Sequence, residues 1–181
     1  MLFAVLFTTV MVLMRTAMPD GGDARTRVAA TLMPFAGIAF LWFIGVVRDG
    51  FGGYEDKFFS TVFIGSGLLF LAMMFAASAT NMAAAHSNGT TAEFARELTL
   101  AFGNTYGLRM AAVFMITLAT IWLKTSLMPR WLVVATYLAA VGILVASDVS
   151  MWLLLAFPLW VLCVSLLLLT RRAGALATDT A

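Results

Sequence analysis

The stretch FFSTVFIGSGLLFLAMMFAA, residues 58–77, contains no charged side chain and decides the fold class. Its large residues are aliphatic or aromatic, and only small or hydroxyl-bearing residues separate them. A helix of about 20 such residues is long enough to cross the hydrocarbon core of a bilayer, which is roughly 30 Å thick. The stretch therefore predicts a transmembrane helix, which we place at residues 58–80.

The composition of the whole chain supports the same environment. Of its 181 residues, 62% are hydrophobic and 11% are charged, against roughly 45–50% and about 25% in soluble domains. A soluble fold needs more polar side chains than this to cover its surface. The composition therefore indicates a polytopic membrane protein and excludes a disordered chain, a disulfide scaffold and a nucleic-acid-binding domain.

Metal and haem chemistry is limited by the scarcity of ligating side chains. The chain has one cysteine, Cys163, and one histidine, His86. A single cysteine allows no intramolecular disulfide and no cysteine-based metal site. One histidine excludes a bis-histidine haem and a three-histidine metal site within the chain. We therefore expect no cofactor and no metal.

Further apolar stretches complete a predicted all-α fold, a bundle of about six transmembrane helices in a single integral membrane domain. The continuous apolar runs lack the alternation of barrel strands. The last apolar region, residues 131–169, would extend about 58 Å as one helix, so a hairpin is expected there, with a polar tail at 171–181. The predicted spans are residues 2–18, 28–47, 58–80, 105–123, 131–146 and 149–169.

Residues 91–102 are mixed in polarity and precede the fourth predicted span. Glu93, Arg96 and Glu97 share one helical face, and Phe94 and Leu98 lie on another. This spacing is typical of an amphipathic helix. The segment is therefore expected either as a short helix at the membrane surface or as an extension of the next span.

The distribution of basic residues predicts the orientation of the bundle. With six spans, the side that holds both termini has six basic residues, Arg48, Lys57, Lys124, Arg130, Arg171 and Arg172. The opposite side has four, Arg15, Arg25, Arg27 and Arg96, or five with Arg109. Because cytoplasmic loops hold an excess of Lys and Arg, both termini are predicted to be cytoplasmic.

Two charged residues fall inside or beside predicted spans and are candidates for binding a ligand or an ion. Arg109 lies about four residues inside the fourth span. An intramembrane charge is costly and commonly functional, although an arginine near a helix end can also extend to the headgroups. Asp148 is the only acid between residues 131 and 169. It is expected to cap a helix that starts near residue 149, and as an intramembrane acid it would instead suit a proton relay or cation site.

Small residues recur every four positions in two spans and predict close helix packing. The packing candidates are Gly103, Gly107 and Ala111 in the fourth span and Ala72 and Ala76 in the third. Small side chains on one stripe let helices approach closely in lipid. The alternative is a helix broken at the two glycines, which would expose the backbone around Asn104, Thr105 and Tyr106, as in transporter substrate sites.

One part of the chain resembles a known group of proteins. The residues are PFAGIAFLWFIGVVRD at 34–49, EDKFF at 55–59 and FIGSGLLF at 63–70. They resemble small, uncharacterised polytopic membrane proteins of actinobacterial type. The resemblance covers the second and third predicted spans well and the rest loosely. It implies a bacterial cytoplasmic membrane, and it implies no activity.

These observations favour a non-enzymatic accessory or assembly subunit. Its partners would be membrane lipids and either a second copy of the chain or a larger membrane complex. The alternative is a small transporter or channel that uses Arg109, Asn104, Tyr106 and Asp148. The third hypothesis is a membrane-embedded enzyme acting on lipid, for which the acid–base candidates are Glu55, Asp56, Glu93 and Glu97.

Overall fold

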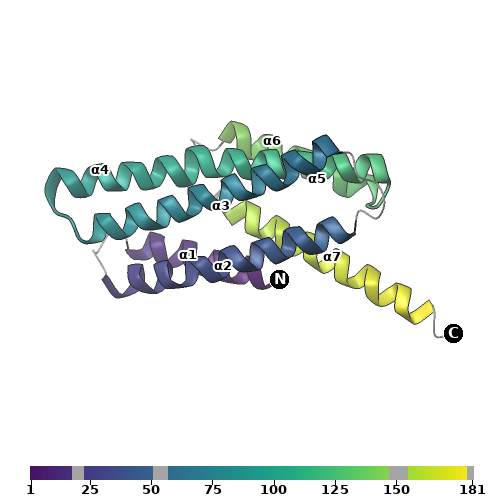
Figure 1. The fold of residues 1–181 in the computed structure, drawn as a ribbon, viewed down its shortest axis with the longest axis horizontal. Helices are drawn as coiled ribbons and strands as arrows, with labels where there is room; N and C mark the ends of the chain where they lie inside the picture. Colours follow the sequence, from purple (N-terminus) through teal and green to yellow (C-terminus); the bar gives the residue numbers. More distant parts are fainter. Residues whose placement is uncertain (18–22, 51–56, 147–154, 179–181) are drawn as a thin grey trace.

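The computed structural model describes residues 1–17, 23–50, 57–146 and 155–178, and these residues fold into helices (Figure 1). The predicted all-α fold is confirmed for them. Because α4, η1 and α5 follow one another without a break, the described helices form six rods. The elements are α1 (Leu2–Ala17), α2 (Asp23–Asp49), α3 (Lys57–Ala85), α4 (Gly89–Leu100), the π-helix η1 (Ala101–Gly107), α5 (Leu108–Thr125), α6 (Arg130–Ala146) and α7 (Ala156–Thr178).

Three rods are long and apolar enough to cross a membrane. They cover Ala24–Asp49, Lys57–Ala85 and Gly89–Thr125. The third rod has 37 residues and is about 55 Å long at 1.5 Å per residue. The other rods contribute shorter apolar helices at Leu2–Met14, Arg130–Val145 and Ala156–Thr170.

The mixed segment at 91–102 extends the next helix and is not a separate surface helix. Its α-helix, α4, continues through η1 into α5. The buried face of α4 consists of small residues, Ala92, Ala95 and Thr99, and it packs on α3. The Thr99 hydroxyl donates to Oγ1 of Thr80 on α3 at 2.9 Å. Small residues and an interhelical hydrogen bond therefore join α4 to the bundle, and the larger apolar side chain of Phe94 is exposed.

The chain folds back between α6 and α7. Nε1 of Trp160 on α7 donates to Oγ1 of Thr136 on α6 at 3.0 Å. In one straight helix these residues would lie about 36 Å apart. The predicted turn and the predicted Asp148 cap lie outside the described residues. Pro158 is the third residue of α7, where its missing N–H breaks no helical hydrogen bond and no kink is required.

Phenylalanine rings fill the middle of the bundle. Ring centroids lie 5.3 Å apart between Phe40 and Phe114, 4.6 Å between Phe63 and Phe114, and 4.7 Å between Phe70 and Phe157. Aromatic rings at these separations contact one another in offset or edge-on geometry. The residues of this aromatic core are at most 2% exposed and come from five rods: Phe3, Phe7, Phe40, Phe63, Phe70, Phe114 and Phe157.

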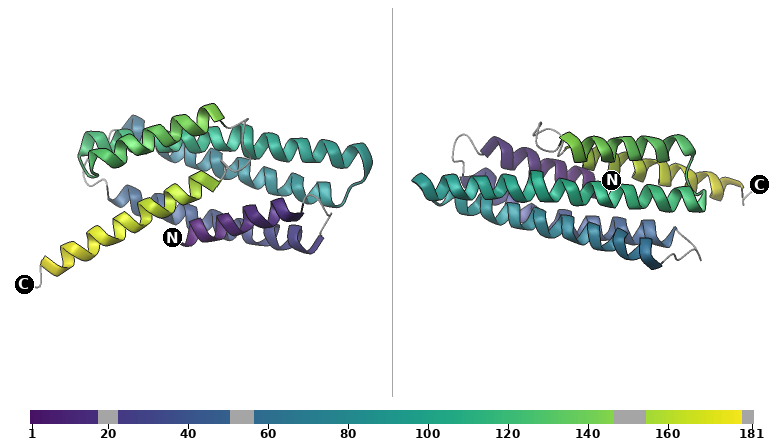
Figure 2. Two further views of the ribbon diagram at one scale, coloured as in Figure 1. Left: turned by 180° about the vertical axis from the view of Figure 1, so that it is seen from behind. Right: turned by 90° about the horizontal axis from the view of Figure 1, so that it is seen from above.

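The ends of the rods define two ends of the molecule. At one end α2 and α5 finish and α3 and α6 begin (Figures 1 and 2). There Nζ of Lys124 lies 4.1 Å from the centroid of the Phe59 ring. We call this the α5–α6 end. At the opposite end α3 turns into α4. Helix α7 leaves the bundle at an angle toward the α5–α6 end, so its last turns stand apart from the other rods (Figure 2).

Candidate functional site

A π-helix widens the long rod at Ala101–Gly107. The N–H of Leu108 bonds to the carbonyl of Gly103, a spacing of five residues in place of the four of an α-helix. Such π-bulges are rare and occur frequently at functional sites. The sequence suggested either an ordinary packed helix or a broken one here. In the structure the helix is not broken at the glycines, but its turn is wider than that of an ordinary α-helix.

The glycines of this segment face α3. Gly103, Gly107 and Ala111 are buried. A Cβ atom on Gly107 would collide with Cε of Met74, whereas one on Gly103 would lie 3.9 Å from Cβ of Ala77, an ordinary contact. Gly107 is therefore the position at which α3 and the π-helix approach most tightly.

On α3 the packing surface differs from the expected stripe. Ala72 is exposed and Ala76 is half-buried, while Met74, Ala77 and Ser78 are buried. The stripe of Ala72 and Ala76 is therefore not the surface that α3 presents to the π-helix, and its packing against another helix stays a prediction.

The polar candidates of the fourth predicted span lie close together in sequence and structure. Arg109 is half-buried, and its Nη1 donates to the carbonyl of Thr105 inside the π-helix at 3.2 Å. Asn104 is half-buried, and the Tyr106 side chain is 55% exposed. Asp148 lies outside the described residues. A guanidinium that bonds to a backbone carbonyl of a widened turn stabilises that turn without needing a ligand.

Arg109→Gln is expected to lower the free energy of unfolding by about 1.5 kcal/mol, because it removes a charge-assisted hydrogen bond to the π-helix. The measurement is helical content followed through denaturation in detergent micelles. Arg96→Gln is the matched control, since Arg96 is exposed on α4 and should change the value by less than about 0.5 kcal/mol. Equal stability of the two variants would show that the Arg109–Thr105 hydrogen bond is unimportant.

The structure describes two of the four carboxylates of the enzyme hypothesis. Glu93 and Glu97 are exposed on α4, next to the turn from α3 into α4. Glu55 and Asp56 lie outside the described residues.

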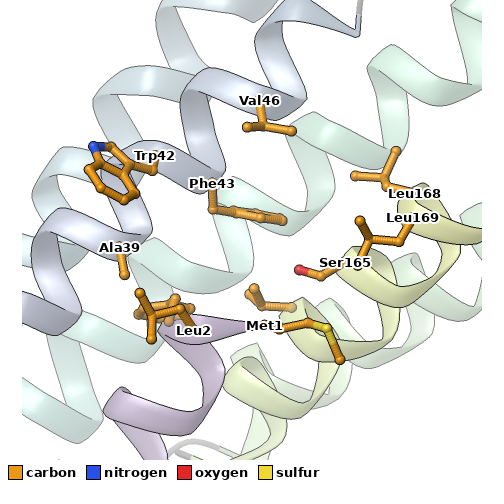
Figure 3. A pocket seen from close by; sticks show the side chains of 11 residues that line it. Met1, Leu2, Ala39, Trp42, Phe43, Val46, Ser165, Leu168 and Leu169 are labelled. Carbon is orange, nitrogen blue, oxygen red and sulfur yellow. The ribbon is translucent and has the colours of Figure 1, made fainter. Parts of the chain in front are cut away.

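A pocket of about 230 Å³ lies between the start of α1, the second half of α2, and α7 (Figure 3). Its side-chain walls are apolar except for the hydroxyl of Ser165, which points toward the cavity in Figure 3, and the indole nitrogen of Trp42. Helix α7 creates this space by leaning away from α2. The lining side chains include Met1, Leu2, Ala39, Trp42, Phe43, Val46, Ser165, Leu168 and Leu169. The sequence analysis missed this pocket, because one serine in an apolar run does not reveal a helix crossing angle.

The described helices therefore contain a widened turn stabilised by Arg109 and a largely apolar pocket beside α7. Among the residues that the structure describes, no group of three or more His, Cys, Asp or Glu side chains could hold a metal ion. No family model, curated protein or solved structure matches this chain.

Proposed function

We propose that this chain is a multi-pass protein of a bacterial cytoplasmic membrane and acts there as a non-catalytic accessory or assembly subunit. The observation behind the proposal is the outer surface of the helices. Large apolar side chains are exposed on successive turns, including Trp42 at 68%, Leu138 at 69% and Val145 at 76%. Soluble monomers rarely expose apolar patches beyond a few hundred Å². We therefore infer that lipid or other membrane helices surround this surface.

The positions of the charges support crossing of the bilayer. Helix α2 has no charged residue between Arg27 and Arg48, an interval that covers about 30 Å of helix and matches the hydrocarbon core. We propose six spans, with the shorter helices α1, α6 and α7 crossing beside the three long ones. The α5–α6 end has Arg48, Lys57, Lys124 and Arg130, and the excess of basic residues favours this end as the cytoplasmic one.

The interior supports a packing role over a transport role. The aromatic core occupies the middle of the bundle, and its rings contact each other across five rods. A transport pathway at this level would need space and polar groups where these rings now pack. The polar candidates Asn104, Tyr106 and Arg109 lie on the π-helix and at the start of α5 instead.

The outer face of α6 offers a surface for close contact with another helix. Ala135, Ala139 and Gly142 are exposed on that face, and a Cβ atom on Gly142 would meet no atom within 4 Å. Stripes of small residues bring helix backbones close together and favour association in lipid. We therefore propose that α6 contacts a second copy or a larger complex.

Native mass spectrometry after mild extraction from the producing membrane tests the proposed role. We expect the chain in the membrane fraction after alkaline carbonate washing, in a complex larger than one copy. A monomer without protein partners would contradict the assembly role. Recovery in the carbonate-soluble fraction would contradict the membrane location itself.

Gly142→Leu is expected to weaken this association about tenfold, because a leucine would keep two helices from approaching closely; packing and interhelical contacts in lipid contribute about 1–2 kcal/mol. Gly45→Leu is the matched control, since Gly45 on α2 is also exposed and has open space around it. The measurement is the monomer fraction over a dilution series in detergent. Equal dissociation of the two variants would exclude α6 as the contact.

A further inference from the structure

We propose that the pocket between α1, α2 and α7 binds one acyl chain of an anionic phospholipid, with the lipid phosphate beside Arg48 at the end of α2. The inference rests on the proposed membrane location and adds a specific lipid ligand to it. It depends on four properties of the pocket: its chemistry, its accessibility, its size and the charge at one end.

The lining suits a hydrocarbon chain. Phe43, Val46 and Leu168 present only carbon atoms from their side chains, and Met1 adds a thioether. Among the residues labelled in Figure 3, two have a polar side-chain atom: Ser165 has a hydroxyl and Trp42 has an indole nitrogen. A polar ligand placed here would lose its hydration without gaining enough hydrogen bonds, whereas a hydrocarbon chain has no hydrogen bonds to lose.

The pocket is accessible from the surroundings of the bundle. Five of its lining residues are also among the exposed apolar side chains, including Trp42 at 68%, Leu2 at 58% and Leu169 at 54%. These residues face the same environment as the outer surface of the helices. In the proposed membrane that environment is lipid, so an acyl chain can enter from the side without crossing water.

The size and shape of the pocket suit a single acyl chain. The pocket has a volume of about 230 Å³ and lies between three helices, α1, α2 and α7. A hydrocarbon chain is thinner than a helix and fills a narrow cavity from one end.

A positive charge lies at the end of the pocket toward which α2 runs. Arg48 follows two residues after the lining residue Val46 on α2 and is exposed. In the sequence, Arg171 and Arg172 follow the lining residue Leu169. Basic pockets between membrane helices on the cytoplasmic side bind anionic lipid headgroups, and the proposed orientation makes this end cytoplasmic.

The experiment is native mass spectrometry of the full chain, reconstituted in vesicles of phosphatidylglycerol or of phosphatidylcholine and then extracted in mild detergent. We expect one phospholipid retained per chain from phosphatidylglycerol vesicles, and at least about fivefold less retention from phosphatidylcholine, since one basic group near an anionic surface contributes about a factor of five. Arg48→Gln should reduce phosphatidylglycerol retention by about that factor and leave phosphatidylcholine retention unchanged.

Ser165→Phe tests the pocket itself, because its ring would occupy the cavity and displace the acyl chain. Cys163→Phe is the matched control on the same helix, since Cys163 is exposed and does not line the pocket. We expect at least a tenfold loss of bound lipid in the first variant and none in the second, with equal helical content in both.

Equal lipid retention by the two phenylalanine variants would overturn the pocket assignment. Equal retention of both lipids by the unaltered chain would overturn the proposed preference for an anionic headgroup. A two-chain mass without lipid, dissociated by Ser165→Phe, would show a second copy in place of the acyl chain. The carbonate wash of the producing membrane tests the membrane location separately, so failure of lipid binding in vesicles is distinct from failure of the membrane location.

Discussion

Replacing Phe40 with alanine is expected to lower the free energy of unfolding by about 3 kcal/mol. Its ring is fully buried, and its centroid lies 4.7 Å from that of Phe3, 5.3 Å from that of Phe114 and 5.5 Å from that of Phe70. Phenylalanine-to-alanine changes in cores cost about 3–5 kcal/mol, partly through the cavity that remains. Lipid is as apolar as the core, so moving the phenylalanine side chain from the core to lipid costs little. We therefore expect a loss at the lower limit of this range.

The measurement is reversible unfolding of the chain in mixed micelles, followed by far-ultraviolet circular dichroism. Phe35→Ala provides a control on the same helix, since the Phe35 ring is 57% exposed and its loss should cost less than about 0.5 kcal/mol. A large loss for Phe35→Ala and a small one for Phe40→Ala would mean that α2 presents the opposite face to the bundle.

Gly67→Leu is expected to destabilise the bundle by about 3 kcal/mol. Gly67 lies where α2, α3 and α5 meet. A Cβ atom on it would lie 2.8 Å from Cδ1 of Ile44 and 3.3 Å from two ring carbons of Phe114. The leucine must displace both neighbours, and overpacking of a filled core costs about 1–3 kcal/mol. The upper limit applies because the ring of Phe114 is itself held by Phe63 and Phe40.

Gly65→Leu separates this steric effect from the general effect of adding a leucine to α3. Gly65 lies two residues away and has no atom within 4 Å of its Cβ position, so its substitution should leave the unfolding midpoint nearly unchanged. The same micelle assay compares the two variants. If Gly67→Leu matched Gly65→Leu, the three helices would not meet at Gly67.

The helical fold was predictable from the sequence, whereas the packing was only partly predictable. An uncharged run such as 58–77 is decided by local composition, and the structure has α3 over it. Whether 91–102 formed a surface helix or an extension depended on Ala92, Ala95 and Thr99 finding a partner on α3. Such a contact joins residues far apart in sequence, and periodicity within one helix does not specify it.

The candidate sites were also only partly predictable from the sequence. A cluster of polar residues around Arg109 was visible in the sequence, but the widened turn that Arg109 supports is a property of the backbone. The pocket beside Ser165 depends on the angle at which α7 leaves the bundle. Crossing angles follow from many side-chain contacts at once, so no short motif records them.

The rods of this bundle differ greatly in length, and the difference has a consequence for the surrounding lipid. The apolar part of α6, Arg130–Val145, spans about 24 Å, whereas the apolar helix α3, Lys57–Ala85, spans about 43 Å. A bilayer accommodates a short segment by thinning and a long one by tilting or thickening. In the proposed membrane, hydrophobic mismatch would therefore be uneven around the protein, with thinned lipid beside a short apolar helix such as Leu2–Met14 of α1. Such a local deformation costs less in a thin bilayer than in a thick one and would sort this chain toward thinner membrane regions.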